Sequence, residues 1–155
     1  MNLSPHFTLE ELTRTSSGLP NVPGLEARDH LVTLCTRVLE PVREILGVPL
    51  RVNSGYRSPQ VNAAAHGSSS SQHMLGEAAD VVPVGLDVEA AMVKIAEAVR
   101  AGRLSVDQAI VYPLGGFLHL SYSSTRAQRN HLLRSAAAGG SGGPYSPWVA
   151  KGQAW

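Results

Sequence analysis

The chain has 155 residues, enough for one domain with a hydrophobic core that folds without a disulfide framework or a structural metal. Its 13 basic and 12 acidic side chains give a net charge of +1 without a basic stripe, so we expect no nucleic-acid partner. No run of about 18 apolar residues occurs, which argues against a membrane span. The first residues lack the pattern of a secretory signal, so we expect synthesis in the cytoplasm without a signal peptide.

The first part of the chain predicts mainly helices. Thr8 begins a capping-box pattern, which starts a short helix. Apolar residues then recur with a helical period over residues 25–46, where Pro41 should kink or divide the helix because it clashes with the preceding turn. Residues 50–53 alternate as in a strand, and Ser58 is placed to cap another short helix.

The second part of the chain predicts strands around one long helix. A serine-rich loop at residues 67–72 precedes a strand at 78–84, and Asp87 is placed to cap an amphipathic helix. Two further strands follow at 108–113 and 117–122. Because helices and strands do not alternate as βαβ units, we expect an α+β fold with a central antiparallel sheet flanked by helices.

The end of the chain differs in composition from the rest. We expect residues 1–135 to form a single domain, followed at 136–155 by a Gly/Ser-rich linker and a C-terminal tail. This tail carries Tyr145, Trp148 and Trp155, so it is expected to pack on its own domain or on a partner.

The stretch "SSQHMLGEAAD" at residues 70–80 contains two side chains that commonly bind metals, His73 and Asp80. Gly76 between them favours a turn that returns His73 over the strand carrying Asp80. His119 lies mid-strand in "FLHLS", on the face opposite its leucine neighbours, and could supply a third ligand. The same residues also fit ordinary roles, as a surface loop histidine, a turn carboxylate and a half-buried strand histidine.

The wider sequence contains three motifs that together closely resemble those of the zinc D-Ala-D-Ala carboxypeptidase family. They are "SGYRS", then S-x-H-x-x-G-x-A-x-D, then a late histidine in a strand, and they occur here in that order. The resemblance covers residues 1–122 and implies a hedgehog/DD-peptidase-like fold. It also implies a peptidase that acts on bacterial peptidoglycan stem peptides. The family includes D-Ala-D-Ala carboxypeptidases and dipeptidases, and phage endolysins that cut L-Ala-D-Glu bonds.

By position, the resemblance implies that His73, Asp80 and His119 hold one Zn²⁺ ion. It also implies a catalytic role for Arg57 in "SGYRS", since a guanidinium suits an oxyanion or a substrate carboxylate. The alternative for Arg57 is an exposed turn arginine paired with a nearby carboxylate. Other residues fall where relatives place substrate-binding groups: Tyr56, Asn62 and Ser71. The two polar ones would equally suit capping or loop roles, and the tyrosine would equally suit packing.

The usual general base is missing from the expected position. Many relatives carry a carboxylate three residues before the last histidine, but here that position is Gly116 and no glutamate follows it. Glu77 is a weak candidate base, because a solvent-facing or salt-bridged role suits it better. Asp107 precedes the neighbouring strand and is expected to lie too far away. Tyr112 or His66 could contribute polar groups.

Three functions fit this sequence. The leading hypothesis is a zinc metallopeptidase of the bacteriophage type, which reaches the cell wall after release or as part of a virion. The second is a zinc-bearing but inactive module that binds peptidoglycan or belongs to a virion, since the usual base is absent. Its aromatic tail could then dock on phage structural proteins. The third is a cytoplasmic D-Ala-D-Ala dipeptidase.

Overall fold

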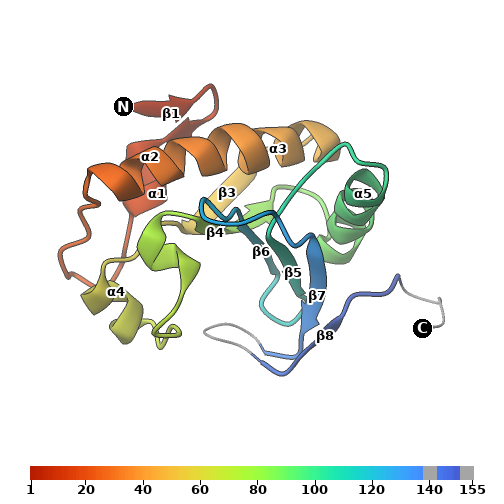
Figure 1. Ribbon diagram of the computed structural model, residues 1–155. Helices are drawn as coiled ribbons and strands as arrows, with labels where there is room; N and C mark the ends of the chain where they lie inside the picture. The colour runs from red at the N-terminus through yellow and green to blue at the C-terminus, as the bar shows by residue number, and fades with distance from the viewer. Residues whose placement is uncertain (138–142, 151–155) are drawn as a thin grey trace.

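The structure, a computed structural model, describes residues 1–137 and 143–150 (Figure 1). The helical elements are α1 (Leu9–Thr13), α2 (Leu25–Leu34), the π-helical turn η1 (Cys35–Leu39), α3 (Glu40–Leu46), α4 (Pro59–Ala64), the 3-10 turn η2 (Gln72–Leu75) and α5 (Val88–Arg100). The strands are β1 (Asn2–Ser4), β2 (Phe7–Thr8), β3 (Leu50–Ser54), β4 (Ala78–Pro83), β5 (Gln108–Tyr112), β6 (Phe117–Ser121), β7 (His131–Ser135) and β8 (Tyr145–Pro147). Helices flank one main sheet, which confirms the predicted α+β class.

The main sheet has six strands in the order β3-β4-β6-β5-β7-β8. The prediction of an antiparallel sheet holds for every neighbouring pair except β5 and β7, which run parallel. This difference follows from the hairpin of β5 and β6, because the end of β6 lies beside the start of β5. A short connection over residues 122–130 then brings β7 to the same end of β5, where Asn130 N–H donates to the Val106 carbonyl. The sheet is therefore mixed.

The apolar stripe at residues 25–46 forms one continuous helical rod, so Pro41 does not divide the helix in two as predicted; the rod instead contains a π-helical turn just before Pro41. The rod passes from α2 through η1 into α3 with helical backbone throughout, and Pro41 closely follows the π-helical turn, where the regular hydrogen-bond ladder is already interrupted. Cys35 is buried within η1, and burial raises the pKa of its thiol to about 12, so this thiol is unreactive. In the part of the chain that the structure describes, no helix is long and apolar enough to span a bilayer.

The two faces of the sheet have different chemistry. The helical rod and α5 lie over one face (Figure 1), and there Val81 on β4 and Leu118 and Leu120 on β6 are fully buried in the core. Successive side chains of a strand point to opposite faces, so Asp80 and His119 lie on the other face. The helices therefore cover the apolar face and leave the polar face for a site.

Part of the predicted tail belongs to the sheet. Strand β8 pairs with β7, and just beyond it Trp148 is only 4% exposed and packs into the core. Its backbone N–H donates to the Leu132 carbonyl at 2.8 Å, and the Arg100 guanidinium lies 5.5 Å from the centre of its ring. The third aromatic residue of the tail, Trp155, lies outside the described residues.

Replacing Trp148 with alanine is expected to lower the free energy of unfolding by about 3 kcal/mol, because it removes a large buried side chain from the core. Urea denaturation followed by circular dichroism measures the change. Leu114→Ala is the matched control, since Leu114 is 75% exposed and its loss should change stability by less than about 0.5 kcal/mol. Equal stabilities of the Trp148 variant and this control would show that the C-terminal segment contributes nothing to the fold.

Candidate metal centre

Three side chains from separate elements converge on the polar face of the sheet. Asp80 and His119 are direct cross-strand partners in the β4–β6 ladder, and His119 Nδ1 lies 2.9 Å from Asp80 Oδ1. His73, from the turn η2, places its Nε2 3.4 Å from the same oxygen. One potential ligand atom from each residue lies within 4.8 Å of the other two. The three residues predicted as metal ligands are thus brought together.

A backbone carbonyl fixes the orientation of the His73 ring. Its Nδ1 lies 2.7 Å from the Gly55 carbonyl, an arrangement in which Nδ1–H donates and Nε2 keeps its lone pair for a metal. Gly55 packs so closely on α1 that a Cβ at this position would overlap with the Leu12 carbonyl. The turn then ends at Gly76, whose left-handed backbone (φ +75°) returns the chain to β4 as the sequence predicts. These two glycines position the first histidine.

The protonation states of the centre suit a metal ion. Burial lowers the pKa of His73 and outweighs the opposing attraction of Asp80. Burial alone would raise the pKa of Asp80, but its interactions with His73 and His119, hydrogen bonds among them, hold it well below its usual range. Metal binding requires a neutral imidazole and an ionised carboxylate. His73 and Asp80 meet that requirement near neutral pH.

The donor set fits zinc. Zinc binds imidazole nitrogen and carboxylate oxygen, and catalytic zinc sites combine three protein ligands with one open position. His73, Asp80 and His119 would supply those three ligands, and all of them line one cavity. An ion held there would therefore be accessible to a substrate.

Arg57 lies directly beside the centre. Its Nη2 is 3.4 Å from Asp80 Oδ2, its Nε donates to Ser54 Oγ at 2.9 Å, and its Nη1 donates to Asn62 Oδ1 at 3.4 Å. Asn62 is buried and donates in turn to the Ser68 carbonyl at 2.9 Å. The guanidinium is therefore fixed at the edge of the metal ligands, next to a carboxylate, and it faces the cavity.

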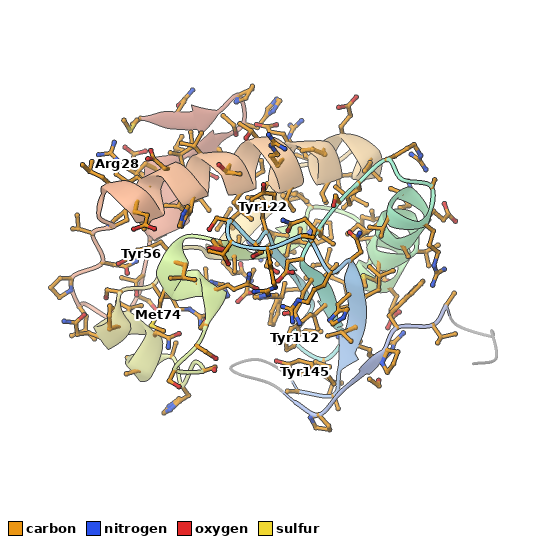
Figure 2. The ribbon with its side chains drawn as sticks, viewed as in Figure 1. Arg28, Tyr56, Met74, Tyr112, Tyr122 and Tyr145 are labelled. Carbon is orange, nitrogen blue, oxygen red and sulfur yellow. The ribbon has the colours of Figure 1, made fainter. Side chains whose placement is uncertain are left out.

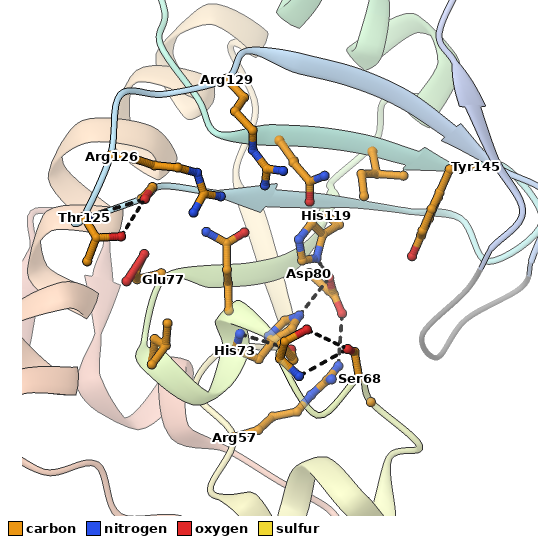
Figure 3. A pocket seen from close by; sticks show the side chains of 18 of the residues that line it. Arg57, Ser68, His73, Glu77, Asp80, His119, Thr125, Arg126, Arg129 and Tyr145 are labelled. Atoms are coloured by element: carbon orange, nitrogen blue, oxygen red, sulfur yellow. Dashed lines mark hydrogen bonds and ion pairs between the residues drawn. The ribbon is translucent and has the colours of Figure 1, made fainter.

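The cavity has a volume of about 430 Å³ and a largely polar wall (Figure 3). The residues predicted for the site that line it are Arg57, Ser71, His73, Glu77, Asp80 and His119. Ser71 also accepts a hydrogen bond from the His73 backbone N–H at 3.2 Å. Neither Tyr56 nor Asn62 is among the lining residues, because Tyr56 packs into the core and Asn62 supports Arg57.

Glu77 is buried beside the cavity rather than facing solvent. Its two carboxylate oxygens accept hydrogen bonds from the Ser124 hydroxyl at 2.9 Å and from the Ser124 backbone N–H at 3.1 Å. His30 Nδ1 lies 3.8 Å from the same carboxylate. Glu77 therefore ties β4 to the loop after β6. Gly116 lies in the turn between β5 and β6 and brings no side chain to the site.

Further polar groups line the cavity, among them Tyr112, which the sequence offered as a possible polar group, whereas His66 is not a lining residue. Tyr145 on β8 and Tyr112 on β5 lie side by side with their hydroxyl oxygens 3.1 Å apart (Figure 2). Arg126 and Arg129 line another part of the wall. The sequence gives no local signal for Tyr145 or the two arginines as site residues, because only the pairing of β7 and β8 and the loop after β6 bring them to the cavity.

A mononuclear metal centre that opens onto a polar cavity is typical of metallohydrolases. Comparison with protein families is more specific, because the peptidase M15 model matches residues 5–121, which are 117 of the 155 residues. The chain belongs to the peptidase M15 family, a zinc-dependent group, and this confirms the predicted resemblance. A comparison with curated proteins gave no match.

Replacing His73 with alanine is expected to weaken Zn²⁺ binding by more than about 100-fold, because even the loss of a group that only supports a ligand costs about 10- to 100-fold. Isothermal titration calorimetry with the metal-free protein measures the affinity. His131→Ala is the control, since this exposed histidine on β7 is not part of the three-residue group. If the His73 variant still bound one equivalent of zinc with unchanged affinity, the ligand assignment would be wrong.

Proposed function

We propose that this peptidase is a zinc metallopeptidase that hydrolyses a peptide bond in the stem peptides of bacterial peptidoglycan. The observation that carries the proposal is the convergence of His73, Asp80 and His119 on a cavity that Arg57 also lines. Zinc, when bound there, supplies a Lewis acid for the scissile carbonyl and lowers the pKa of water. Membership of the peptidase M15 family supports the reaction type.

The role proposed for Arg57 is to stabilise negative charge as it develops on the scissile carbonyl oxygen. Ser54 and Asn62 hold its guanidinium in one orientation, so little rearrangement is needed when the charge appears. The contact with Asp80 leaves part of the planar donor fork directed at the cavity. Arg57 can therefore serve the ligand set and the substrate at the same time.

A second candidate function is a zinc-bearing but inactive module that binds peptidoglycan. The observation that favours it is the lack of an evident proton acceptor, which peptide hydrolysis requires. Among the described residues that line the cavity, the carboxylates are Asp80, which is a ligand, and Glu77, which bonds to Ser124 through both oxygens. Glu77 can act as a base only if it leaves Ser124.

The proposed place of action is the bacterial cell wall, because polymeric peptidoglycan is found there. We propose that the protein acts as a free lysin of the phage type or as part of a virion. The endolysins within the resembled family support this setting. Contact with phage structural proteins would then involve surfaces other than Trp148, which is buried in its own domain.

The zinc-loaded protein is expected to release soluble peptides from purified peptidoglycan, and chelation or His119→Ala should abolish the release because each removes the metal. Mass spectrometry of the soluble fraction identifies the bond that is cut. His131→Ala should release peptides at the wild-type rate. If the zinc-loaded protein released no peptides, the result would support the inactive module. If it cleaved free D-Ala-D-Ala but left polymeric peptidoglycan uncut, the result would support a dipeptidase.

Arg57→Ala is expected to lower kcat by about 10²- to 10³-fold, the usual cost of losing one preorganised group that stabilises an oxyanion. Arg57→Lys should recover only part of this loss, since an ammonium cannot contact Ser54, Asn62 and Asp80 in the same plane. Steady-state kinetics on a soluble stem peptide measures kcat, and zinc content is determined for each variant. A zinc-loaded Arg57→Ala protein with unchanged kcat would exclude the proposed role.

A further inference from the structure

A pair of arginines shares one buried carboxylate at the wall of the cavity. Asp107, just before β5, is fully buried, and Arg129 donates to it from Nε at 3.0 Å and from Nη2 at 2.7 Å. Arg126 donates from Nη2 to the same carboxylate at 2.9 Å. Both arginines lie in the loop between β6 and β7, beyond the region that the family model matches. This group is therefore an addition to the metal centre.

The charges of this group do not balance. Burial would raise the pKa of Asp107, but hydrogen bonds from Arg129 hold it below its usual range, so the carboxylate stays ionised. Two guanidinium groups against one carboxylate leave this three-residue group with one net positive charge. Arg126 is 49% exposed and Arg129 is 37% exposed, so this charge is accessible to a ligand.

The two arginines have different roles within the group. Arg129 forms a bidentate pair with Asp107, and its backbone N–H also donates to that carboxylate at 3.3 Å, so it is fixed in place. Among the described residues, the Arg126 side chain donates one hydrogen bond, through Nη2. The remaining N–H groups of its planar fork are available to a second carboxylate. Of the two arginines, Arg126 is therefore the one whose guanidinium can bind a ligand.

We propose that Arg126, held by Asp107 and supported by Arg129, binds a carboxylate of the stem-peptide substrate. This inference rests on the proposed function and adds a specificity-determining residue to it. In Figure 3, Arg57 and Arg126 lie on opposite sides of the three metal ligands, so the two guanidiniums contact different parts of a bound peptide. Stem peptides with lysine at the third position offer two such groups, the α-carboxylate of D-glutamate and the C-terminal carboxylate.

The test compares Arg126→Gln with wild type on three synthetic stem peptides. One carries both carboxylates, one has the D-glutamate α-carboxyl amidated, and one has a C-terminal amide. For wild type, amidation of the bound carboxyl should raise KM about 10-fold, and the peptide that shows this effect identifies the carboxylate. Arg126→Gln should raise KM by a similar factor on the first peptide, keep kcat within about 2-fold, and be insensitive to that amidation.

Two matched variants control for charge and for folding. Arg51→Gln removes the same charge from an exposed position on β3 away from the cavity and should leave every KM unchanged. Arg126→Lys keeps the charge without the fork and should give an intermediate KM, which serves as the test if the glutamine variant does not fold. Retention of the full amidation effect in Arg126→Gln would overturn the inference, and so would a wild type that cleaves all three peptides with equal KM.

Failure of the proposed peptidase activity can be distinguished from failure of the Arg126 inference. If wild type cleaves none of the peptides, calorimetric binding of the same peptides to the zinc-loaded protein still tests Arg126. Weaker binding of one amidated peptide, with no such difference in Arg126→Gln, would support the carboxylate site without catalysis. Equal affinities for all three peptides would overturn the inference in that case too.

Discussion

The candidate metal centre is built around the contact between Asp80 and His119 across the β4–β6 ladder. Strand register has a period of two, so a slip of one residue would turn Asp80 into the apolar core and bring Val81 to the cavity. Both strands have neighbours on each side, and this makes such a slip costly. His73 and Arg57 then take their places around the shared carboxylate.

Local signals in the sequence predict much of the fold and most of the metal centre. The capping box at Thr8 and the helix cap at Asp87 depend on neighbouring residues, and both are observed. The long helix stays continuous past Pro41, because the π-helical turn before it accommodates the proline. Spacing alone left ordinary roles open for His73, Asp80 and His119, and the resemblance to the peptidase family singled them out as candidate ligands; the structure brings them together. The polar face of β6 also follows from simple alternation.

The parts of the fold and of the site that the sequence does not predict depend on contacts between residues far apart in the chain. The position of β7 is set by the hairpin of β5 and β6, and β8 reaches the sheet only by pairing with β7, so the short sequences of these strands do not predict them. The same limit applies to buried carboxylates. Nothing in the local sequence distinguishes the roles of Glu77 and Asp107. In the fold, Ser124 donates to Glu77 and Arg129 donates to Asp107, and no periodicity of the sequence indicates either partner.

The strands that line the cavity differ in local stability, because they occupy different positions in the sheet. Asp80 on β4 and His119 on β6 lie on interior strands, so their backbone amides are expected to exchange with solvent only when much of the domain opens. Tyr145 lies on β8, which among residues 1–137 and 143–150 pairs with β7 alone and so forms one edge of the sheet. Local opening of this edge requires less free energy than opening of the centre. The edge of the sheet at Tyr145 can therefore open locally while Asp80 and His119 keep their geometry.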